Sequence, residues 1–385
     1  MQFTFATAQR IIFGEGVRHQ LGGLADEWPG PVMVLCGSDR RRAEFALAEL
    51  KSRQRPITLF QVAGEPTIGQ IQAATQRARH GNVALVIAIG GGSVIDAGKA
   101  VATLLCNDGP IEDYLEVIGR GRPLTRAGLP VIAVPTTAGT GSEVTRNAVL
   151  AAPPQKVKVS LRHHLMLPRL ALVDPELTYS LPPELTASTG LDALTQLIEP
   201  FLSLKANPLA DAVCREGLPR AARALARAFR QGDDREARRD LALASLLGGM
   251  ALANAGLGAV HGLAAPLGGL FPAPHGALCA RLLPEVLTVN LRAVRERGSD
   301  PTLQQRFDEL GRLLTGRPEA RADDAIGWVR DLVDLVQPRA LSSYGLTPAD
   351  FPQIVEKARA SSSMQANPVA LTNDELLEIL ALALG

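Results

Sequence analysis

Apolar runs of strand length alternate with helical patterns through the first half of the chain and then disappear. Residues 83–93 (VALVIAIGGGS), 129–143 (LPVIAVPTTAGTGSE) and 169–175 (RLALVDP) each hold a continuous apolar stretch. Strands without polar alternation are buried on both faces, which is typical of a parallel sheet covered by helices. Further strands are expected over residues 31–37 and 57–62, and helices over residues 42–53 and 67–81.

From about residue 181 onward the helical period dominates and strand-like runs are no longer found. Helices are expected over residues 184–203, 208–229, 235–255, 302–315, 323–336, 348–360 and 373–384. A chain of 385 residues is also long for a single core. The pattern therefore predicts an α/β domain over residues 1–180, followed by an all-helical domain over residues 181–385.

The composition argues against nucleic-acid binding, a disulfide framework and a membrane segment. The formal net charge is only +1, so no basic field favours nucleic acid as a partner. The cysteines Cys36, Cys106, Cys214 and Cys279 are widely spaced and form no CxxC pair, so a disulfide framework is not indicated. Because no apolar run has the length of a signal-peptide core or a membrane span, we expect a soluble cytoplasmic protein without a membrane partner.

Two loops that follow buried strands carry residues suited to a nucleotide. In the first, glycines at 90–92 precede Ser93 and a helix, where a close backbone and free N–H groups can meet a pyrophosphate. The alternative is a tight turn in which Ser93 only caps the helix, and the loop does not match GxGxxG. The second loop concentrates hydroxyl side chains at Thr136, Thr137, Thr140 and Ser142. Open α/β sheets bind ligands at such strand ends, although a plain hydroxyl-rich loop is the alternative.

The helical half holds residues that could bind a metal. Asp192 and Gln196 lie four residues apart and share a face of the expected helix. Downstream, His261 and His275 are two of only six histidines and lie in an almost charge-free stretch. A carboxylate and two histidines could form an Asp/His/His metal set, whereas a single histidine in such a stretch is more often a core residue.

These motifs together carry a family resemblance. In this order, GGGSVIDAGKA, PTTAGTGSEVT, LVDPELTYSLPP, TGLDALTQLIE and HGLAAPLGGLFPAPHG resemble the iron-containing (group III) alcohol dehydrogenase family, and the tail NPVALTNDELLEIL extends the similarity to nearly the whole chain. The resemblance implies the fold shared with dehydroquinate synthase, an NAD or NADP cofactor, one divalent metal (Fe²⁺ or Zn²⁺), and a homodimer in which the N-terminal strand pairs at a sheet edge. The expected activity is direct hydride transfer between a small alcohol and its aldehyde or ketone.

The resemblance also implies roles for individual residues. The residues that would contact the cofactor are Gly91, Gly92, Ser93, Asp96, Thr136, Thr137, Thr140, Asn147 and Lys158, with the pyrophosphate at Gly91 to Ser93. The metal ligands, and so the catalytic centre, would be Asp192, His261 and His275.

Two positions depart from the family pattern. Many members have histidine as a fourth ligand where this chain has Gln196, and histidine for proton transfer where it has Ala265. An amide oxygen binds these metals more weakly than imidazole does. We therefore expect a three-ligand site, with Gln196 as a weak fourth ligand or as a hydrogen-bond partner of the substrate. Loss of the metal is the alternative. Without a histidine at Ala265, the alcohol proton must leave through water, the cofactor ribose or another group.

The choice between NAD and NADP depends on the residues after the strand at 31–37. An acidic residue there holds the ribose 2′-hydroxyl of NAD, whereas a small residue with arginine nearby favours the 2′-phosphate of NADP. If Gly37 occupies the acid's place, Ser38 and Arg40 favour NADP; if Asp39 occupies it, NAD is favoured. The pattern leaves both registers open.

Three other functions share parts of this pattern. A metal-independent reductase of the maleylacetate reductase type has the same fold but is not expected to share the TAGTGSEVT loop. A lyase like dehydroquinate synthase needs many Lys, Arg and Asn contacts to a phosphorylated substrate, which are not found around the metal motifs. A non-catalytic protein with a decayed metal site would bind NAD(P) and turn over no alcohol or aldehyde.

Overall fold

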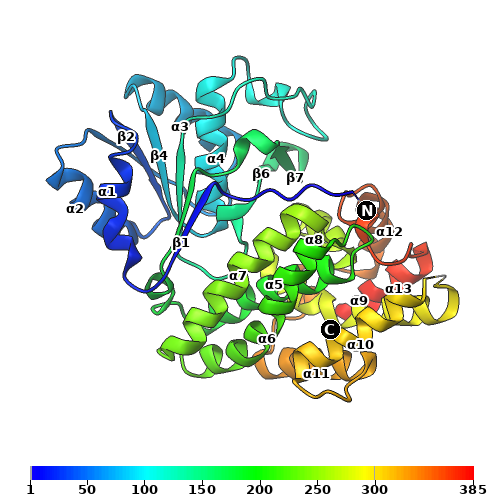
Figure 1. The fold of residues 1–385 in the computed structure, drawn as a ribbon. Coiled ribbons are helices and arrows are strands. Elements are labelled where there is room, and N and C mark those ends of the chain that lie inside the picture. The colour runs from blue at the N-terminus through cyan, green and yellow to red at the C-terminus, as the bar shows by residue number, and fades with distance from the viewer. Residues whose placement is uncertain (1, 299) are drawn as a thin grey trace. The chain divides into compact units, whose positions relative to one another are not determined.

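The computed structural model describes residues 2–298 and 300–385. The chain divides into two compact units (Figure 1). One spans Ala6–Ser180, and the other spans Leu181–Gly385 together with the N-terminal residues up to Phe5. The first unit is an α/β unit and the second is helical, so the predicted fold class is confirmed.

The α/β unit is built on a parallel sheet with strand order β1-β8-β5-β4-β2-β3 (Figure 1). Its strands are β1 (Arg10–Phe13), β2 (Val32–Cys36), β3 (Ile57–Gln61), β4 (Leu85–Gly90), β5 (Val131–Pro135) and β8 (Leu170–Val173). In the register, Val34 of β2 lies beside both Leu59 of β3 and Ile87 of β4. A separate antiparallel pair, β6 (Asn147–Ala152) and β7 (Val157–Arg162), follows the threonine-rich loop.

Helices cover both faces of the sheet. They are α1 (Leu21–Ala25), α2 (Glu44–Ser52), α3 (Ile68–His80) and α4 (Gly92–Cys106). Met33 and Val86 pack with α3, α4 and the β6–β7 pair on one face, whereas Val34 and Ile87 pack with α1 and α2 on the other. Because successive strand residues point to opposite faces and both faces are buried, the strands show no polar alternation.

The helical unit consists of α5 (Pro183–Leu202), α6 (Pro208–Arg230), α7 (Arg235–Ala255), α8 (Ala259–Leu270), α9 (His275–Arg297), α10 (Pro301–Thr315), α11 (Ala322–Val336), α12 (Phe351–Arg359) and α13 (Asn373–Ala383). α5, α6 and α7 pack against one another, and α9 packs against α5, α8 and α13. The helices predicted from the sequence did not include α8 and α9. Glycine and proline are frequent in α8 and in the connection to α9, and both residues lower helix propensity, so the helical period is weak there.

The helices of the described residues differ from membrane spans in length or in hydropathy. No single helix there has both the length and the hydropathy of a span. Only α7 and α8 taken together would reach these limits, and they are bent by 98° relative to each other.

A buried ion pair holds α4 against the loop that follows β5. The Lys99 ammonium lies 2.9 Å from an Asp96 carboxylate oxygen and donates to the Ser142 carbonyl oxygen (2.9 Å) and the Thr145 hydroxyl (3.0 Å). Asp96 also accepts from the Ser142 hydroxyl and from the Val149 N–H (2.9 Å). Since an unpaired buried carboxylate is costly, Lys99 is needed to keep this loop against the helix.

Replacing Lys99 with methionine should lower the unfolding free energy of the α/β unit by about 3–5 kcal/mol, because Asp96 would remain buried without its partner. The two tryptophans of the chain, Trp28 and Trp328, lie in different units, so a Trp328→Phe background makes fluorescence report on the α/β unit alone. Urea unfolding in that background measures the change. The matched control is Lys51→Met at an exposed position of α2, which should cost less than about 0.5 kcal/mol. A loss below about 1 kcal/mol for Lys99→Met would contradict this account of the loop.

Candidate functional site

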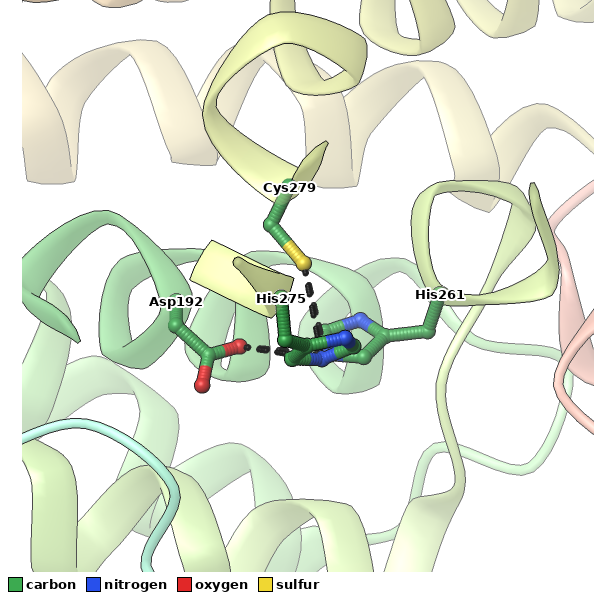
Figure 2. A group of neighbouring side chains, drawn as sticks. All are labelled: Asp192, His261, His275 and Cys279. Atoms are coloured by element: carbon green, nitrogen blue, oxygen red, sulfur yellow. Dashed lines mark hydrogen bonds and ion pairs between the residues drawn. The ribbon is translucent and has the colours of Figure 1, made fainter. Parts of the chain in front are cut away.

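Helices α5, α8 and α9 direct titratable side chains to one buried point of the helical unit (Figure 2). Asp192 comes from the middle of α5 and His261 from the first turn of α8, while His275 and Cys279 come from the first two turns of α9. One ligand atom from each of these residues lies within 4.8 Å of those of the others. The structure therefore brings the predicted Asp/His/His set together and adds a thiol that the sequence analysis missed.

The distances show that the donor atoms surround a common point. Nε2 of His261 lies 3.3 Å from Oδ1 of Asp192, and Nε2 of His275 lies 3.7 Å from the same oxygen. Sγ of Cys279 lies 3.7 Å from Nε2 of His275 and 3.9 Å from Nε2 of His261. Oxygen, nitrogen and sulfur atoms that converge in this way form a donor set suited to a divalent transition metal.

Glu199 fixes the orientation of His261. It lies on α5 seven residues after Asp192, and its Oε2 lies 2.6 Å from Nδ1 of His261. Its other oxygen accepts a hydrogen bond from the Val260 N–H at 2.7 Å. A histidine that donates Nδ1–H to a carboxylate keeps Nε2 free for a metal. The sequence analysis missed Glu199, although the seven-residue spacing from Asp192 placed both on one helix face.

The charged forms of these groups stabilise one another. Burial alone would raise the pKa of Asp192, but the hydrogen bond with His261 and the charge of His275 outweigh it, so the pKa is lowered. Burial opposes the charge of His261, yet the negative charges of Cys279 and Glu199 raise its pKa well above the usual value. The charge of Cys279 is the main cause that raises the pKa of His275, and the two histidines lower the pKa of Cys279 against the effect of burial. A cation that binds here would compete with the protons of the histidine rings and of the thiol, so its affinity should depend on pH.

Gln196 also faces this site, and its side-chain oxygen is available to a ligand. It lies one turn after Asp192 on α5, is only 3% exposed, and its side chain makes a hydrogen bond to the Asp192 carboxylate, which must be donated by the amide nitrogen. The amide oxygen Oε1 is buried and has no hydrogen-bond partner in the part of the chain that the structure describes. A buried acceptor without a partner costs free energy, so a ligand that donates to it gains affinity. Ala265 lies at an exposed position of α8.

In the α/β unit, the glycine-rich and threonine-rich loops lie against each other at the carboxyl ends of β4 and β5. The Thr136 N–H donates to the carbonyl oxygen of the last residue of β4 at 2.9 Å. A Cβ added to Gly91 would lie 3.4 Å from Oγ1 of Thr137, and one added to Gly92 would lie 2.6 Å from Oγ1 of Thr140. Only glycine therefore fits at Gly92 without moving the second loop. The structure brings together these two sets of predicted cofactor residues.

The N-terminus of α4 is arranged to receive an anion. Its N-cap is Gly91, which supplies no side-chain hydrogen bond, whereas Thr67 and Gln70 form a capping box at the start of α3. Ser93 lies inside α4, so it is not the capping residue of the alternative interpretation. Uncapped N–H groups and the positive end of a helix dipole are the features that bind a pyrophosphate.

The predicted cofactor residues outside these two loops lie after β2, on α4 and on the β6–β7 pair. Gly37 and Ser38 directly follow β2. The Asp96 carboxylate is committed to the ion pair and hydrogen bonds that hold the threonine-rich loop. Asn147 is the first residue of β6, and Lys158 on β7 has its ammonium 2.6 Å from a carboxylate oxygen in the connection between β3 and α3. Cys36 pairs with Ile89, so Gly37 lies beside the start of the glycine-rich loop, whereas Asp96 and Lys158 are each engaged in an ion pair.

Comparison with known proteins gives the same family for both units. The family model described as iron-containing alcohol dehydrogenase matches residues 8–175, and the model for the C-terminal part of that family matches residues 186–384. Alcohol dehydrogenase 4 of Saccharomyces cerevisiae is 36% identical over 333 residues, which cover 86% of this chain and 84% of the yeast protein.

Solved structures agree with these matches. The crystal structure of a 1,3-propanediol oxidoreductase aligns with a TM-score of 0.91 and 30% sequence identity, covering 100% of both chains. Sulfoacetaldehyde reductase from Bifidobacterium kashiwanohense, in complex with NAD+, aligns with a TM-score of 0.86 and 28% identity, covering 100% of this chain and 99% of that one. The sequence motifs predicted the same assignment: the chain belongs to the iron-containing alcohol dehydrogenase family.

Proposed function

We propose that this protein is a metal-dependent, NADP-linked alcohol dehydrogenase that interconverts a small alcohol and its aldehyde or ketone. The observation that carries this proposal is the convergence of Asp192, His261 and His275 on one buried point. A carboxylate oxygen and two imidazole nitrogens suit Zn²⁺ or Fe²⁺. When bound, the metal would polarise the substrate oxygen as a Lewis acid, and the nicotinamide would exchange a hydride with the adjacent carbon.

The side chains around this point position the ligands and the substrate. Glu199 holds the His261 ring with Nε2 directed toward the Asp192 oxygen. Gln196 donates to Asp192 and offers its unpaired Oε1 to the substrate hydroxyl. This contact would orient the alcohol without requiring Gln196 to bind the metal.

The proton of the alcohol leaves to water in this proposal. Ala265 carries no titratable group at the position where many relatives have histidine. The His275 side chain is 36% exposed, so the site has contact with solvent on that side. Because a bound metal lowers the pKa of a coordinated hydroxyl, release to water is sufficient.

The surroundings of β2 favour NADP over NAD. Gly37 directly follows the strand and carries no carboxylate for a ribose 2′-hydroxyl. Both Asp39 oxygens accept hydrogen bonds from the Arg41 guanidinium, at 2.8 and 3.0 Å, so this acid is already engaged. A pocket of about 630 Å³ at this end of the unit is lined by Arg18, Arg41 and Arg42 together with Asp39 and Glu176. Arg41 is paired with Asp39 and Arg18 with Glu176, whereas Arg42 is in no ion pair among the described residues, so Arg42 is the guanidinium most readily available to a phosphate. Guanidinium groups are suited to a 2′-phosphate.

We further infer that the protein is a homodimer. β1 is an edge strand of the sheet. An edge strand presents unpaired backbone groups that a second copy of the chain can bind.

The proposed activity is tested by turnover at defined metal content. Protein purified without chelator is expected to contain close to one Fe or Zn per chain, to reduce small aldehydes with NADPH, to lose activity with chelator and to regain it with added Zn²⁺ or Fe²⁺. A metal content far below one per chain, with activity unaffected by added metal, would contradict the metal dependence; maleylacetate turnover would then favour a metal-independent reductase. Tight NAD(P) binding without turnover of any alcohol or aldehyde would favour a non-catalytic protein.

The cofactor assignment is tested with Gly37→Asp. The new carboxylate should repel a 2′-phosphate and accept from a 2′-hydroxyl, so the ratio of kcat/KM for NADPH to that for NADH should fall about tenfold or more, equivalent to about 1.4 kcal/mol. Gly37→Ala is the matched control, because an added Cβ meets only Val94 at 3.9 Å. An unchanged or increased ratio in Gly37→Asp would show that Gly37 does not stand at the ribose.

A further inference from the structure

Cys279 has no part in the mechanism described so far, although its thiol lies in the middle of the candidate site. It lies one helical turn after His275 on α9, so both side chains leave the same face of the helix. The residue is fully buried, and its sulfur points toward the two imidazoles (Figure 2). Free cysteines elsewhere in the chain, such as Cys214 on α6, are not part of such a cluster among the described residues.

The distances around Cys279 match those between ligands of one tetrahedral metal ion. With a metal–sulfur bond of about 2.3 Å and a metal–nitrogen bond of about 2.05 Å, tetrahedral angles place sulfur and nitrogen about 3.6 Å apart, and nitrogen and oxygen about 3.3 Å apart. The observed sulfur–nitrogen distances are 3.7 and 3.9 Å, and the nitrogen–oxygen distances to Asp192 are 3.3 and 3.7 Å. These four donor–donor distances thus fit ligands of a shared ion, and the two remaining pairs lie within 4.8 Å.

Ligand chemistry also favours Cys279 over Gln196 as the fourth ligand of the metal. Gln196 offers a neutral amide oxygen, and its nitrogen is already bonded to Asp192. Cys279 offers a thiolate, which is anionic and is a preferred ligand of Zn²⁺. The thiolate therefore binds the more strongly of the two.

We propose that the Cys279 thiolate is the fourth protein ligand of the metal, in place of the histidine that relatives have at the position of Gln196. This proposal rests on the metal-dependent function proposed above. The resulting set is one carboxylate, one thiolate and two imidazoles, so the two anionic ligands neutralise a divalent ion. Asp192, His261, His275 and Cys279 would hold the ion, which would polarise the substrate oxygen, and Gln196 would lie beside the substrate hydroxyl. The sulfur ligand shifts the preference of the site from Fe²⁺ toward Zn²⁺.

Cobalt substitution tests the ligand directly, because a thiolate bound to Co²⁺ gives an intense near-ultraviolet charge-transfer band. The full-length protein is stripped of metal and titrated with Co²⁺. Wild-type protein and Gln196→Leu should show the band at one Co²⁺ per chain, and Cys279→Ser should lose it. Cys214→Ser is the matched control, a buried cysteine on another helix, and should keep the band.

The Zn²⁺ affinity, measured by competition with a coloured chelator, gives a second readout that does not depend on activity. Cys279→Ser should weaken the Zn²⁺ affinity more than the loss of a residue that only hydrogen-bonds to a ligand, which typically costs roughly 10- to 100-fold. Cys279→His should restore Zn²⁺ binding without the cobalt–sulfur band. Gln196→His should leave the band in place.

A third variant keeps the test decisive if Cys279→Ser does not fold. In a protein with Cys36, Cys106 and Cys214 all replaced by alanine, the only thiol left is Cys279, and the band should persist. Three results would overturn the Cys279 assignment and leave the proposed function standing. They are loss of the band in that folded variant, persistence of the band in Cys279→Ser, and absence of the band from wild-type protein that binds one Co²⁺. Wild-type protein that binds neither Co²⁺, Zn²⁺ nor Fe²⁺ would overturn both.

Discussion

The burial of a carboxylate, two imidazoles and a thiol where α5, α8 and α9 meet is the constraint on which the helical unit depends. Charged groups in an apolar interior are costly unless each is neutralised. Glu199 ties α5 to α8 by bonding both the His261 ring and the α8 backbone. Gly276 allows α9 to approach α5 closely, since a Cβ there would lie 2.2 Å from the Ser188 carbonyl oxygen. These contacts bring the donor atoms of the three helices together, and a bound divalent cation would neutralise the remaining negative charge of the cluster.

The geometry of the site links Gln196, where the chain departs from the family pattern, to Cys279. Gln196 removes an imidazole from α5, while Cys279 supplies a thiolate from α9 within 4 Å of both remaining imidazoles. In the proposed site, this exchange makes the ligand set more anionic and softer, which affects both the metal preferred and the strength with which the metal polarises an oxygen. In the same proposal, Gln196 orients the substrate through its unpaired oxygen. A change in substrate choice could follow without loss of the metal.

Much of the fold could be predicted because the buried strands have a continuous apolar pattern that only a doubly covered parallel sheet requires. Asp192, His261 and His275 could be named from residue type and motif, but α8 and α9 were not recognised, since glycine and proline are frequent in α8 and in the connection to α9. Residues four apart share a face only if they lie on a helix. Because α9 was not predicted, the spacing of His275 and Cys279 did not indicate that the thiol lies beside the histidine. Glu199 was missed for another reason: a glutamate on a helix usually faces water, and only the packing of α8 shows that this one is buried. The sequence also could not show whether Gly37 or Asp39 lies beside the cofactor ribose, because that depends on the single residue at which β2 ends.

The most direct measurement is crystal diffraction from the metal-loaded protein at the absorption edge of the bound metal. The account predicts one anomalous peak per chain, within bonding distance of Asp192, His261, His275 and the Cys279 sulfur, with the Gln196 oxygen outside bonding distance. The absence of a peak at this point would contradict the metal-dependent mechanism. A peak bonded to the Gln196 oxygen, with the Cys279 sulfur turned away, would contradict the assignment of the fourth ligand.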